Sequence, residues 1–471
     1  MWLEVLLGLL LLYFLKRQFF SKDRPSSTLQ IPGMNAKSTD FGNLEDIGKF
    51  GSLHKFLVYL HGKYGDIATF WFGTQLVVSI SAPDMFKEQL TLFDRPHLLF
   101  KLFEPFIGVK SLQYANKEDG KNRRKVYDRK MSHQAVMRYI YEFNAVSEDL
   151  VELLTNELNI GISAHNFSTH MAEFALKSGL LVMFGDAADD SKIKEFHTNY
   201  KICWGEMESR LGGHIPNPES EQEVNFKNAL EKAKSFVREI VAIRKNMVIT
   251  DNNEKIIDIL IENCPDEETL LSDAITYVVG GFHTTANSLV WGFYYIASHK
   301  DVQEKLHAEI NSNIGKAEIT HENIRKCSYL RQVFDETLRC SVLAPFAARV
   351  VDHEDITIKG FSIPAGTPII HALGVSLQNK DIFPNPETFD PERFNEANLK
   401  KLPKLAYQPF GVGKRICPGQ RFAIFEASIC IATVIRKFKI SLADPGKKIE
   451  HVHGLVTHPS HEILIKLNSR C

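Results

Sequence analysis

Ten residues near the carboxyl end, Phe410 to Gly419, read FGVGKRICPG and combine residue types that could bind a metal cofactor. A cysteine thiolate such as that of Cys417 is a metal ligand, and Arg415 offers a forked cation to a carboxylate. Three glycines leave room for the backbone to approach a large flat group: Gly411, Gly413 and Gly419. Apolar periodicity after Gly419 predicts a helix, whose amino terminus would stabilise the thiolate. The alternative is a glycine-rich loop around one buried cysteine.

A second segment, GGFHTT at residues 280–285, places small and polar residues inside an uncharged run from Ala274 to Ser298. On a helix, Gly280 and Thr284 share a face, so the missing side chain opens a notch one turn from a hydroxyl. The threonine hydroxyl can also bond back to the carbonyl four residues earlier and bend the helix, which widens the notch. The alternative is that Thr284 only bends a core helix.

A third pattern is Glu336-Thr337-Leu338-Arg339, in which a carboxylate and a guanidinium lie three residues apart. On a helix these two side chains share a face and can pair. Such pairs are usually solvated, but the apolar neighbours of this one indicate burial, and a buried pair needs further partners.

The pattern F-x-x-G-x-R-x-C-x-G at residues 410–419 resembles the haem-binding loop of the cytochromes P450. The resemblance implies haem b as cofactor, with Cys417 as axial thiolate ligand of the iron, Phe410 beside the sulfur, and Gly413 and Gly419 in the binding loop. It also implies that Arg415 contacts a haem propionate. A thiolate ligand favours O–O cleavage, so the chemistry expected is oxygen activation.

The same resemblance assigns residues elsewhere in the chain. Glu336 and Arg339 match the family's E-x-x-R, and Arg393 in FDPERF matches the third member of that structural triad. Arg349 matches an arginine that reaches a propionate. The family has a second propionate-binding arginine with a tryptophan before it. The equivalent helix here, DGKNRRKVYD, lacks that tryptophan, which leaves Arg123 and Arg124 as alternative candidates for this contact.

The central segment GGFHTT resembles the family's oxygen-activation motif, small-Gly-x-acid-Thr-Thr. The resemblance implies that Gly280, His283 and Thr284 are catalytic, with dioxygen in the notch and Thr284 hydrogen-bonded to it. His283 stands where the family usually has an acid. It could relay protons, or it could be a core histidine that only fills space.

The elements that would carry these residues are mainly helical. Residues 67–72 with 76–80, and 356–358 with 361–363, are each predicted to form a β-hairpin, and most of the rest has helical periodicity. The helix with GGFHTT is predicted to begin near Pro265, and to be a core helix rather than a membrane span because His283, Asn287 and several hydroxyls are costly in lipid. We therefore expect the cytochrome P450 fold, mainly α with small β-sheets, in one large domain.

The amino terminus has an apolar stretch followed by Lys16, Arg17, Lys22 and Arg24. We expect a membrane anchor at residues 1–20, a basic and polar linker at 21–45 and a haem-thiolate catalytic domain at 46–471. A cleaved signal peptide is the rival interpretation, but its positive charges would precede the apolar stretch. Positive charge after the anchor predicts a cytosolic catalytic domain. We expect the membrane to be that of the endoplasmic reticulum.

The net charge of −1 over 471 residues gives no bias toward nucleic acid, and none is expected as a partner. Seven scattered cysteines without a C-x-x-C pair suggest neither a disulfide framework nor a zinc site. Within the family, GSLHKFLVYLHGKYG with FWFG and LVVS most resembles family 20, subfamily A, a branch without a settled substrate.

These resemblances predict a monooxygenase that inserts one oxygen atom into a lipophilic small molecule, such as a sterol or another lipid. Electrons would come from an NADPH-dependent reductase docked near Lys414 and the basic stretch Lys121–Lys125. The aromatic-rich segment Leu98–Gly108 is a candidate roof for the substrate pocket, although core packing explains its phenylalanines equally well. The alternatives are a haem-thiolate isomerase or dehydratase, and a haem-based binder or sensor with little turnover.

Overall fold

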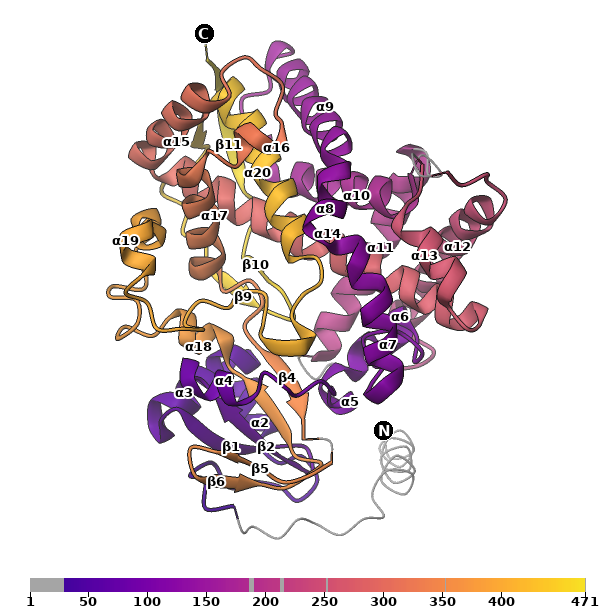
Figure 1. Ribbon diagram of the computed structural model, residues 1–471, viewed down its shortest axis with the longest axis vertical. Helices are drawn as coiled ribbons and strands as arrows, with labels where there is room; N and C mark the ends of the chain where they lie inside the picture. Colours follow the sequence, from indigo (N-terminus) through magenta and orange to yellow (C-terminus); the bar gives the residue numbers. More distant parts are fainter. Residues whose placement is uncertain (1–28, 186–189, 212–215, 251–252, 352, 471) are drawn as a thin grey trace.

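The computed structural model describes residues 29–185, 190–211, 216–250, 253–351 and 353–470 (Figure 1). The predicted anchor, residues 1–20, and the first part of the predicted linker lie outside these ranges. Within them, no helix has both the length and the apolar character needed to cross a membrane.

One end of the molecule is built on a four-stranded sheet with the order β1-β2-β7-β4 (Figure 1). Its strands are β1 (Ile67–Phe72), β2 (Gln75–Ile80), β7 (Pro368–His371) and β4 (Ala347–Val350). Strands β2 and β7 are parallel, and the other pairs are antiparallel. The helices α2 (Leu44–Phe50), α3 (Leu53–Tyr64), α4 (Pro83–Glu88) and α18 (Leu373–Leu377) belong to the same end. The hairpin predicted at residues 67–80 is confirmed.

Three smaller sheets complete the β structure of the described residues. The predicted hairpin at residues 356–363 is confirmed as β5 (Ile356–Ile358) paired with β6 (Phe361–Ile363). Near the carboxyl end, β11 (Leu464–Ser469) lies between β3 (His165–Asn166) and β8 (Phe438–Leu442), and β9 (His451–His453) pairs with β10 (Thr457–Pro459).

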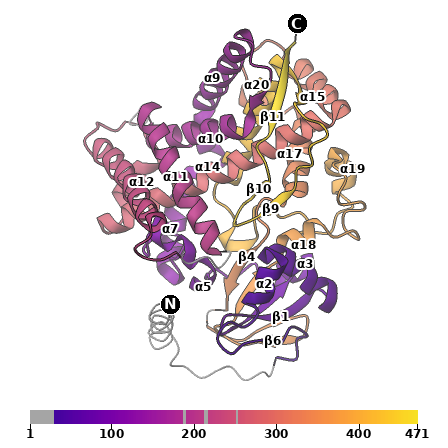
Figure 2. The ribbon, with the colours of Figure 1, turned by 180° about the vertical axis from the view of Figure 1, so that it is seen from behind.

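The rest of the described chain is mainly helical, as predicted (Figure 2). The longer helices are α7 (Lys117–Tyr127), α9 (Ile140–Asn159), α10 (Phe167–Phe184), α11 (Asp190–Leu211), α12 (Glu221–Lys245), α14 (Glu267–Ser298), α15 (Lys300–Asn313), α17 (Ser328–Ser341) and α20 (Gln420–Lys437). The shorter ones are α5 (His97–Phe100), η1 (Lys101–Phe103), α6 (Glu104–Ile107), η2 (Asp128–Met131), α8 (His133–Val136), η3 (Met137–Tyr139), α13 (Ile256–Asn263), α16 (His321–Ile324), η5 (Pro391–Phe394), α19 (Glu396–Leu399) and η6 (Gly413–Arg415).

Helix α14 crosses the middle of this helical part and packs against α10, α17 and α20 (Figures 1 and 2). It begins at Glu267, because the carboxylate of Asp266 caps it by accepting a 2.8 Å hydrogen bond from Thr269 N–H. Its apolar side chains are buried on several sides, including Leu289, Trp291 and Phe293. The prediction of a core helix is confirmed, and the membrane-spanning interpretation of this run is wrong.

Part of the predicted linker belongs to the folded body. Met34 N–H donates to Thr69 O at 2.8 Å, so this segment runs beside β1. A side chain at Gly33 would overlap the Thr69 backbone, which explains why a glycine stands there. Helix α2 follows from Leu44, so the chain is already packed on the sheet before residue 46.

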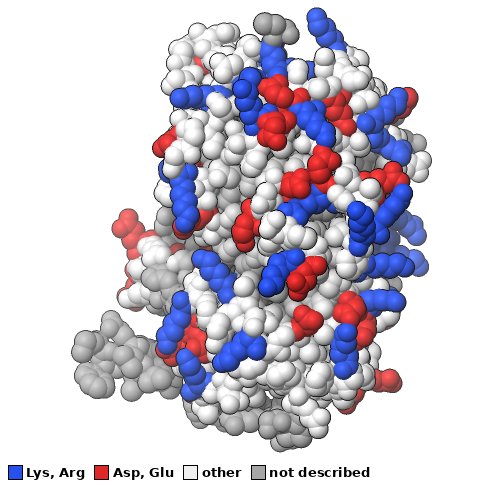
Figure 3. All heavy atoms as spheres, turned by 90° about the vertical axis from the view of Figure 1, so that its left-hand side faces the viewer, with Lys and Arg blue, Asp and Glu red and all other residues white. Residues whose placement is uncertain are grey.

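Charged side chains of both signs are interspersed on the face of the molecule shown in Figure 3. A surface that binds nucleic acid usually gathers lysine and arginine into one patch. The mixture on this face agrees with the net charge of −1.

Candidate active site

The loop around Cys417 is closed by its own backbone. Cys417 N–H donates to Phe410 O at 3.0 Å, and Ile416 N–H donates to Gly413 O at 3.0 Å. Helix α20 begins at Gln420, so the helix predicted after Gly419 is confirmed and Cys417 lies three residues before it. The loop therefore holds the cysteine close to the amino terminus of a helix that packs in the core.

Cys417 is an exposed residue, although protein surrounds its thiol. Burial raises the pKa of the thiol, while the Gly419 N–H and the cations Arg124 and Arg95 lower it. Both facts hold if the sulfur faces a space inside the protein. A metal ion bound there would stabilise the thiolate that burial disfavours.

Gly413 has a structural reason for being glycine that differs from the predicted one. Its φ is +70°, and an added Cβ would lie 2.6 Å from Leu90 O. Lys414 N–H also donates to Leu90 O at 3.2 Å. Gly413 thus allows the loop to pack on the Leu90 backbone, whereas a Cβ at Gly411 would meet nothing within 4 Å.

Arg349 and Arg415, both predicted propionate contacts, are buried and bond to backbone carbonyls. Arg349 donates to Ala348 O at 2.8 Å and to Val412 O at 3.0 Å. Arg415 donates to Ala115 O at 2.6 Å, and its guanidinium carbon lies 4.3 Å from the centre of the Phe93 ring. The Nε atoms of both arginines are buried without a hydrogen-bond partner among the described residues.

Arg124 and Arg123 are adjacent in α7 but serve different partners. Arg124 donates to Ile416 O at 2.8 Å, next to Cys417, and pairs with Asp128 at 2.8 Å. Arg123 instead donates through Nε to Asp273 of α14 at 3.2 Å. The structure therefore brings Arg124, and not Arg123, to the cysteine loop.

A fourth arginine, Arg95, joins this group and was missed by sequence reasoning. It bonds to Gln113, and its pKa lies well below the usual range because of burial and the charges of Arg415, Arg349 and Arg124. An isolated arginine before a proline, in FDRPHL, gives no spacing signal that could have revealed it.

The four arginines form a positive cluster with few anionic partners, in which Arg124, Arg349 and Arg415 are buried and Arg95 is half-buried. Burial and neighbouring arginines lower the pKa of Arg349 to about 10 and that of Arg415 to about 9. Among the described residues, the only carboxylate recorded in an ion pair with this cluster is Asp128, bound to Arg124. Buried cations require anions, so the cluster fits a ligand that carries carboxylates.

An aromatic ring beside Arg415 comes from Phe93. Gly120 lies one turn before Arg124 in α7, and a Cβ built there would lie 2.8 Å from Phe93 Cε1 and would overlap the Ala115 carbonyl. The absence of a large side chain in this turn of α7 thus lets Phe93 approach the guanidinium. Sequence reasoning noted that the family tryptophan was missing, but not that a ring from another segment lies here.

Glu336, Arg339 and Arg393 are brought together as a buried group. Arg339 donates to both carboxylate oxygens of Glu336, at 2.7 and 2.9 Å, and neither side chain is exposed. Arg393 of η5 forms an ion pair with Glu336 at 3.3 Å. Arg339 also donates to the carbonyls of Leu377 and Pro386, so the group joins α17 to the chain that precedes the cysteine loop.

The Gly280–Thr284 turn of α14 has the predicted geometry. Thr284 Oγ1 donates to Gly280 O at 3.1 Å, and Thr285 Oγ1 donates to Gly281 O at 3.0 Å. Gly280 is exposed although the helix is central, and an added Cβ at Gly280 or Gly281 would meet nothing within 4 Å. This turn of the core helix therefore faces open space.

The ring of His283 packs against the aromatic rings of Tyr200 and Trp204. Its ring lies 3.9 Å from that of Trp204 in α11, and Asn287 Nδ2 lies 3.4 Å from its Nε2. Burial, with His458 and His197 nearby, lowers the pKa of His283 to about 3. The ring is therefore neutral at physiological pH.

The basic stretch Lys121–Lys125 offers less surface charge than the sequence suggested. Arg123 and Arg124 are buried in the contacts described above, and Lys121 pairs with Glu118 at 2.9 Å. Lys125 and Lys414 are exposed.

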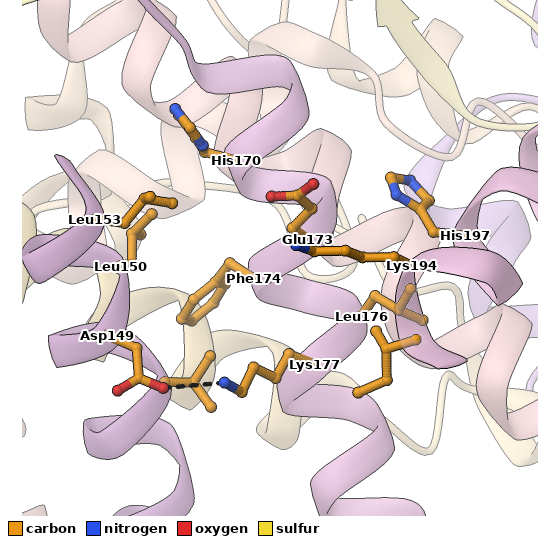
Figure 4. A pocket seen from close by; sticks show the side chains of 12 residues that line it. Asp149, Leu150, Leu153, His170, Glu173, Phe174, Leu176, Lys177, Lys194 and His197 are labelled. Atoms are coloured by element: carbon orange, nitrogen blue, oxygen red, sulfur yellow. Dashed lines mark hydrogen bonds and ion pairs between the residues drawn. The ribbon is translucent and has the colours of Figure 1, made fainter. Parts of the chain in front are cut away.

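A cavity of about 200 Å³ lies between α9, α10 and α11 (Figure 4). Its lining includes Lys177, which pairs with Asp149 at 3.1 Å, and contains none of the predicted site residues. The charged lining of this cavity is already partly paired, so the residues around Cys417 remain the candidate site.

Comparisons with known proteins agree on one family. A family model described as cytochrome P450 matches residues 32–466. Cytochrome P450 20A1 of Bos taurus is 31% identical over 445 residues, which cover 93% of this chain and 93% of that protein. The protein of the same name from Homo sapiens is 30% identical over 448 residues with the same coverage. Cytochrome P450 3A19 of Capra hircus aegagrus is 34% identical over 43% of this chain and 94% of that protein.

Proposed function

This chain belongs to the cytochrome P450 family, and from that premise we propose that it is a haem-thiolate monooxygenase that inserts one atom of dioxygen into a lipophilic small molecule. The observation that carries the proposal is the group of four arginines, three buried and Arg95 half-buried, beside the exposed residue Cys417. A haem brings what both lack: two carboxylates for the arginines and a metal ion for the thiolate. When bound, this cofactor supplies the activation of oxygen.

Each residue of the site then has a defined task. Cys417 would ligand the iron, with Phe410 beside the sulfur and Gly419 donating its N–H toward it. The carboxylates would be held by Arg95, Arg124, Arg349 and Arg415. Glu336, Arg339 and Arg393 would fix the chain that precedes the cysteine loop, away from the reaction itself.

The open turn of α14 would lie over the reacting atoms. Gly280 leaves the space for dioxygen, and Thr284 keeps a hydroxyl at the edge of that space while it bends the helix. The hydroxyl can donate a hydrogen bond to oxygen there, if it gives up its bond to Gly280 O.

The haem assignment is tested by a carbon monoxide difference spectrum of the purified full-length chain. The wild type should absorb at the wavelength typical of thiolate-ligated haem, and Cys417→Ala should lose that band. Cys430→Ala is the matched control, since Cys430 is a fully buried cysteine on α20 itself. Equal loss in both variants, or retention in Cys417→Ala, would contradict the role of Cys417.

The electron donor and the location belong to the same proposal. A reductase that takes electrons from NADPH would dock near the cysteine loop, where Lys414 and Lys125 are exposed. An anchor at residues 1–20 would hold the protein at the endoplasmic reticulum membrane with this face in the cytosol. Oxidation of NADPH that requires both the reductase and a lipid substrate would support the oxygenase.

A second candidate is an isomerase or dehydratase that rearranges an already oxygenated substrate. The observation in its favour is His283, which replaces an acid with a ring that is neutral at physiological pH. Product formed from an oxygenated lipid without NADPH or reductase would select this candidate.

His283 would relay protons if the oxygenase is correct, because of its place beside Thr284. The test compares NADPH consumed per product in wild type, His283→Ala and His283→Asp. Unchanged coupling in the alanine variant would leave His283 with a packing role against Trp204.

A further inference from the structure

Faces of three helices enclose the cavity of about 200 Å³ between α9, α10 and α11 (Figure 4). Most of its lining residues are three or four apart on their helix, as expected of side chains on one face. The apolar lining consists of Val146, Leu150, Leu153, Phe174, Leu176 and Ile193. All of these are buried except Leu153, which is 41% exposed. The cavity therefore has an apolar floor and a side open to solvent.

The charged lining of this cavity is balanced. Its carboxylates come from Asp149 and Glu173, and its ammonium groups come from Lys177 and Lys194. Asp149 and Lys177 form an ion pair at 3.1 Å. Glu173 and Lys194 carry opposite charges on neighbouring helices and can neutralise each other. No net charge is left to attract an ionic ligand, so the lining favours a neutral one.

Two histidines complete the lining, and each is 8% exposed. His170 has a partner, because its Nε2 lies 3.2 Å from a carboxylate oxygen of Glu157. The ring of His197 forms no hydrogen bond with a described residue, yet neither of its nitrogens is fully buried. Burial and the charge of Lys201 lower the pKa of His197 to about 4, so the ring is neutral at physiological pH. A neutral imidazole offers a ligand one donor and one acceptor nitrogen.

The ring of His197 also connects the cavity to α14. It lies 6.3 Å from the ring of Phe282 at an interplanar angle of 88°, which is an edge-to-face contact. Phe282 is buried and directly precedes His283 and Thr284. A ligand bound to His197 would therefore touch a side chain that packs on the turn proposed to hold oxygen.

We propose that this cavity is an effector site for a small neutral phenol with a fused bicyclic ring, whose hydroxyl group hydrogen-bonds to His197. The volume of about 200 Å³ exceeds the roughly 150 Å³ of a cavity that holds benzene, which leaves room for a second ring. Phe174 in the floor offers the bicyclic ring an aromatic contact. Binding itself is independent of the proposed function, whereas the effect on α14 rests on it.

The hydroxyl group is selected by the chemistry of the lining. A phenol donates to the acceptor nitrogen of His197, and an ether of the same shape cannot donate. A carboxylate or an ammonium group would lose its hydration in the cavity without gaining a net opposite charge.

The test is calorimetric titration of the full-length, haem-loaded protein with three probes that share one ring system. They are 2-naphthol, 2-methoxynaphthalene and 2-naphthoate. A saturating azole that ligates the haem iron occupies the space over the haem, so the heat reports binding elsewhere. Without the azole, the carbon monoxide spectrum checks the haem site independently.

We expect wild type to bind 2-naphthol at one site and roughly twofold to tenfold more tightly than the ether, because the ether loses one hydrogen bond. His197→Phe keeps a ring without nitrogens and should remove this difference. Leu153→Trp fills the cavity from its exposed side and should weaken both ligands. The control is His307→Phe, which replaces a half-buried histidine of α15 outside the cavity and should leave the affinities unchanged.

The effector role is read from the affinity of the azole, measured by the shift of the Soret band. Coupling between two sites is reciprocal, so 2-naphthol should change this affinity by about fivefold or more in wild type. His197→Phe and Leu153→Trp should reduce the change.

Equal binding of 2-naphthol and its ether in wild type would overturn the proposal and leave water as the partner of His197. Tightest binding of 2-naphthoate would overturn it in favour of an anionic ligand. An azole affinity that 2-naphthol leaves unchanged would overturn the effector role. Failure of the proposed function would appear instead as a missing carbon monoxide band, with selective binding of 2-naphthol retained.

Discussion

Glu426 is a carboxyl buried in α20 that the proposed chemistry does not use. It is not exposed at all, and neither of its oxygens has a hydrogen-bond partner of good geometry among the described residues. Burial raises its pKa to about 8, and Ser178 offsets this only in part. In the unfolded chain a glutamate titrates near 4.3, so the folded protein keeps a proton that the unfolded chain releases.

The sign of the pH dependence follows from this difference. Between about pH 4.3 and pH 8 the folded state binds more protons at Glu426 than the unfolded state, so the free energy of unfolding falls as pH rises. Over this range the free energy of unfolding falls by about 1.4 kcal/mol for each pH unit, so the decrease from pH 5 to pH 8 is about 4 kcal/mol. With an unfolding entropy of about 0.9 kcal/mol/K for a chain of this length, that corresponds to about 4 °C in Tm.

The perturbation is Glu426→Gln, which keeps the shape but cannot ionise. We expect Tm of the variant minus Tm of wild type to increase by about 4 °C from pH 5 to pH 8, measured by circular dichroism at a fixed scan rate. The difference in Tm between variant and wild type at a single pH is not the measured quantity, because the glutamine amide would be buried without hydrogen-bond partners as well. The exposed Glu152→Gln of α9 controls for the loss of one negative charge. A difference in Tm that stays constant across this range would refute the reasoning.

Three further predictions concern single contacts. Arg123→Leu leaves Asp273 buried without its cation and should cost about 3 to 5 kcal/mol in urea unfolding; a loss below about 1 kcal/mol would show that the pair is solvated. Gly413→Ala should reduce haem loading, measured as Soret absorbance per protein, because alanine disfavours the φ of +70° and its Cβ would overlap the Leu90 backbone. The control is Gly62→Ala inside α3, where a Cβ meets nothing within 4 Å, and it should raise the free energy of unfolding by about 0.5 to 1 kcal/mol. Glu336→Gln leaves two arginines without their shared carboxylate and should lower Tm and the yield of folded protein; an unchanged Tm would contradict a structural role.

Several features of the protein could be predicted from the sequence because they depend on neighbours in the chain. Apolar strand-like runs flanking turn residues predicted both hairpins, and apolar periodicity predicted the helix after Gly419. The distance of four residues between Gly280 and Thr284 puts both on one helix face and allows the hydroxyl to bond back to the Gly280 carbonyl, as it does. Family resemblance added the ordered residues from Glu336 to Cys417, which no periodicity contains.

Only the tertiary structure decided which residues share the site across long separations. Arg95 and Phe93 reach Arg415 from more than 300 residues away, and no local pattern marks them. The choice between Arg123 and Arg124 depended on which of two adjacent side chains faces Asp273. Glu208 and His458 meet through a hairpin and a helix 250 residues apart. Such contacts depend on how helices and strands pack against one another. Sequence periodicity predicts which face of an element is buried, but it does not predict which distant residues pack on that face.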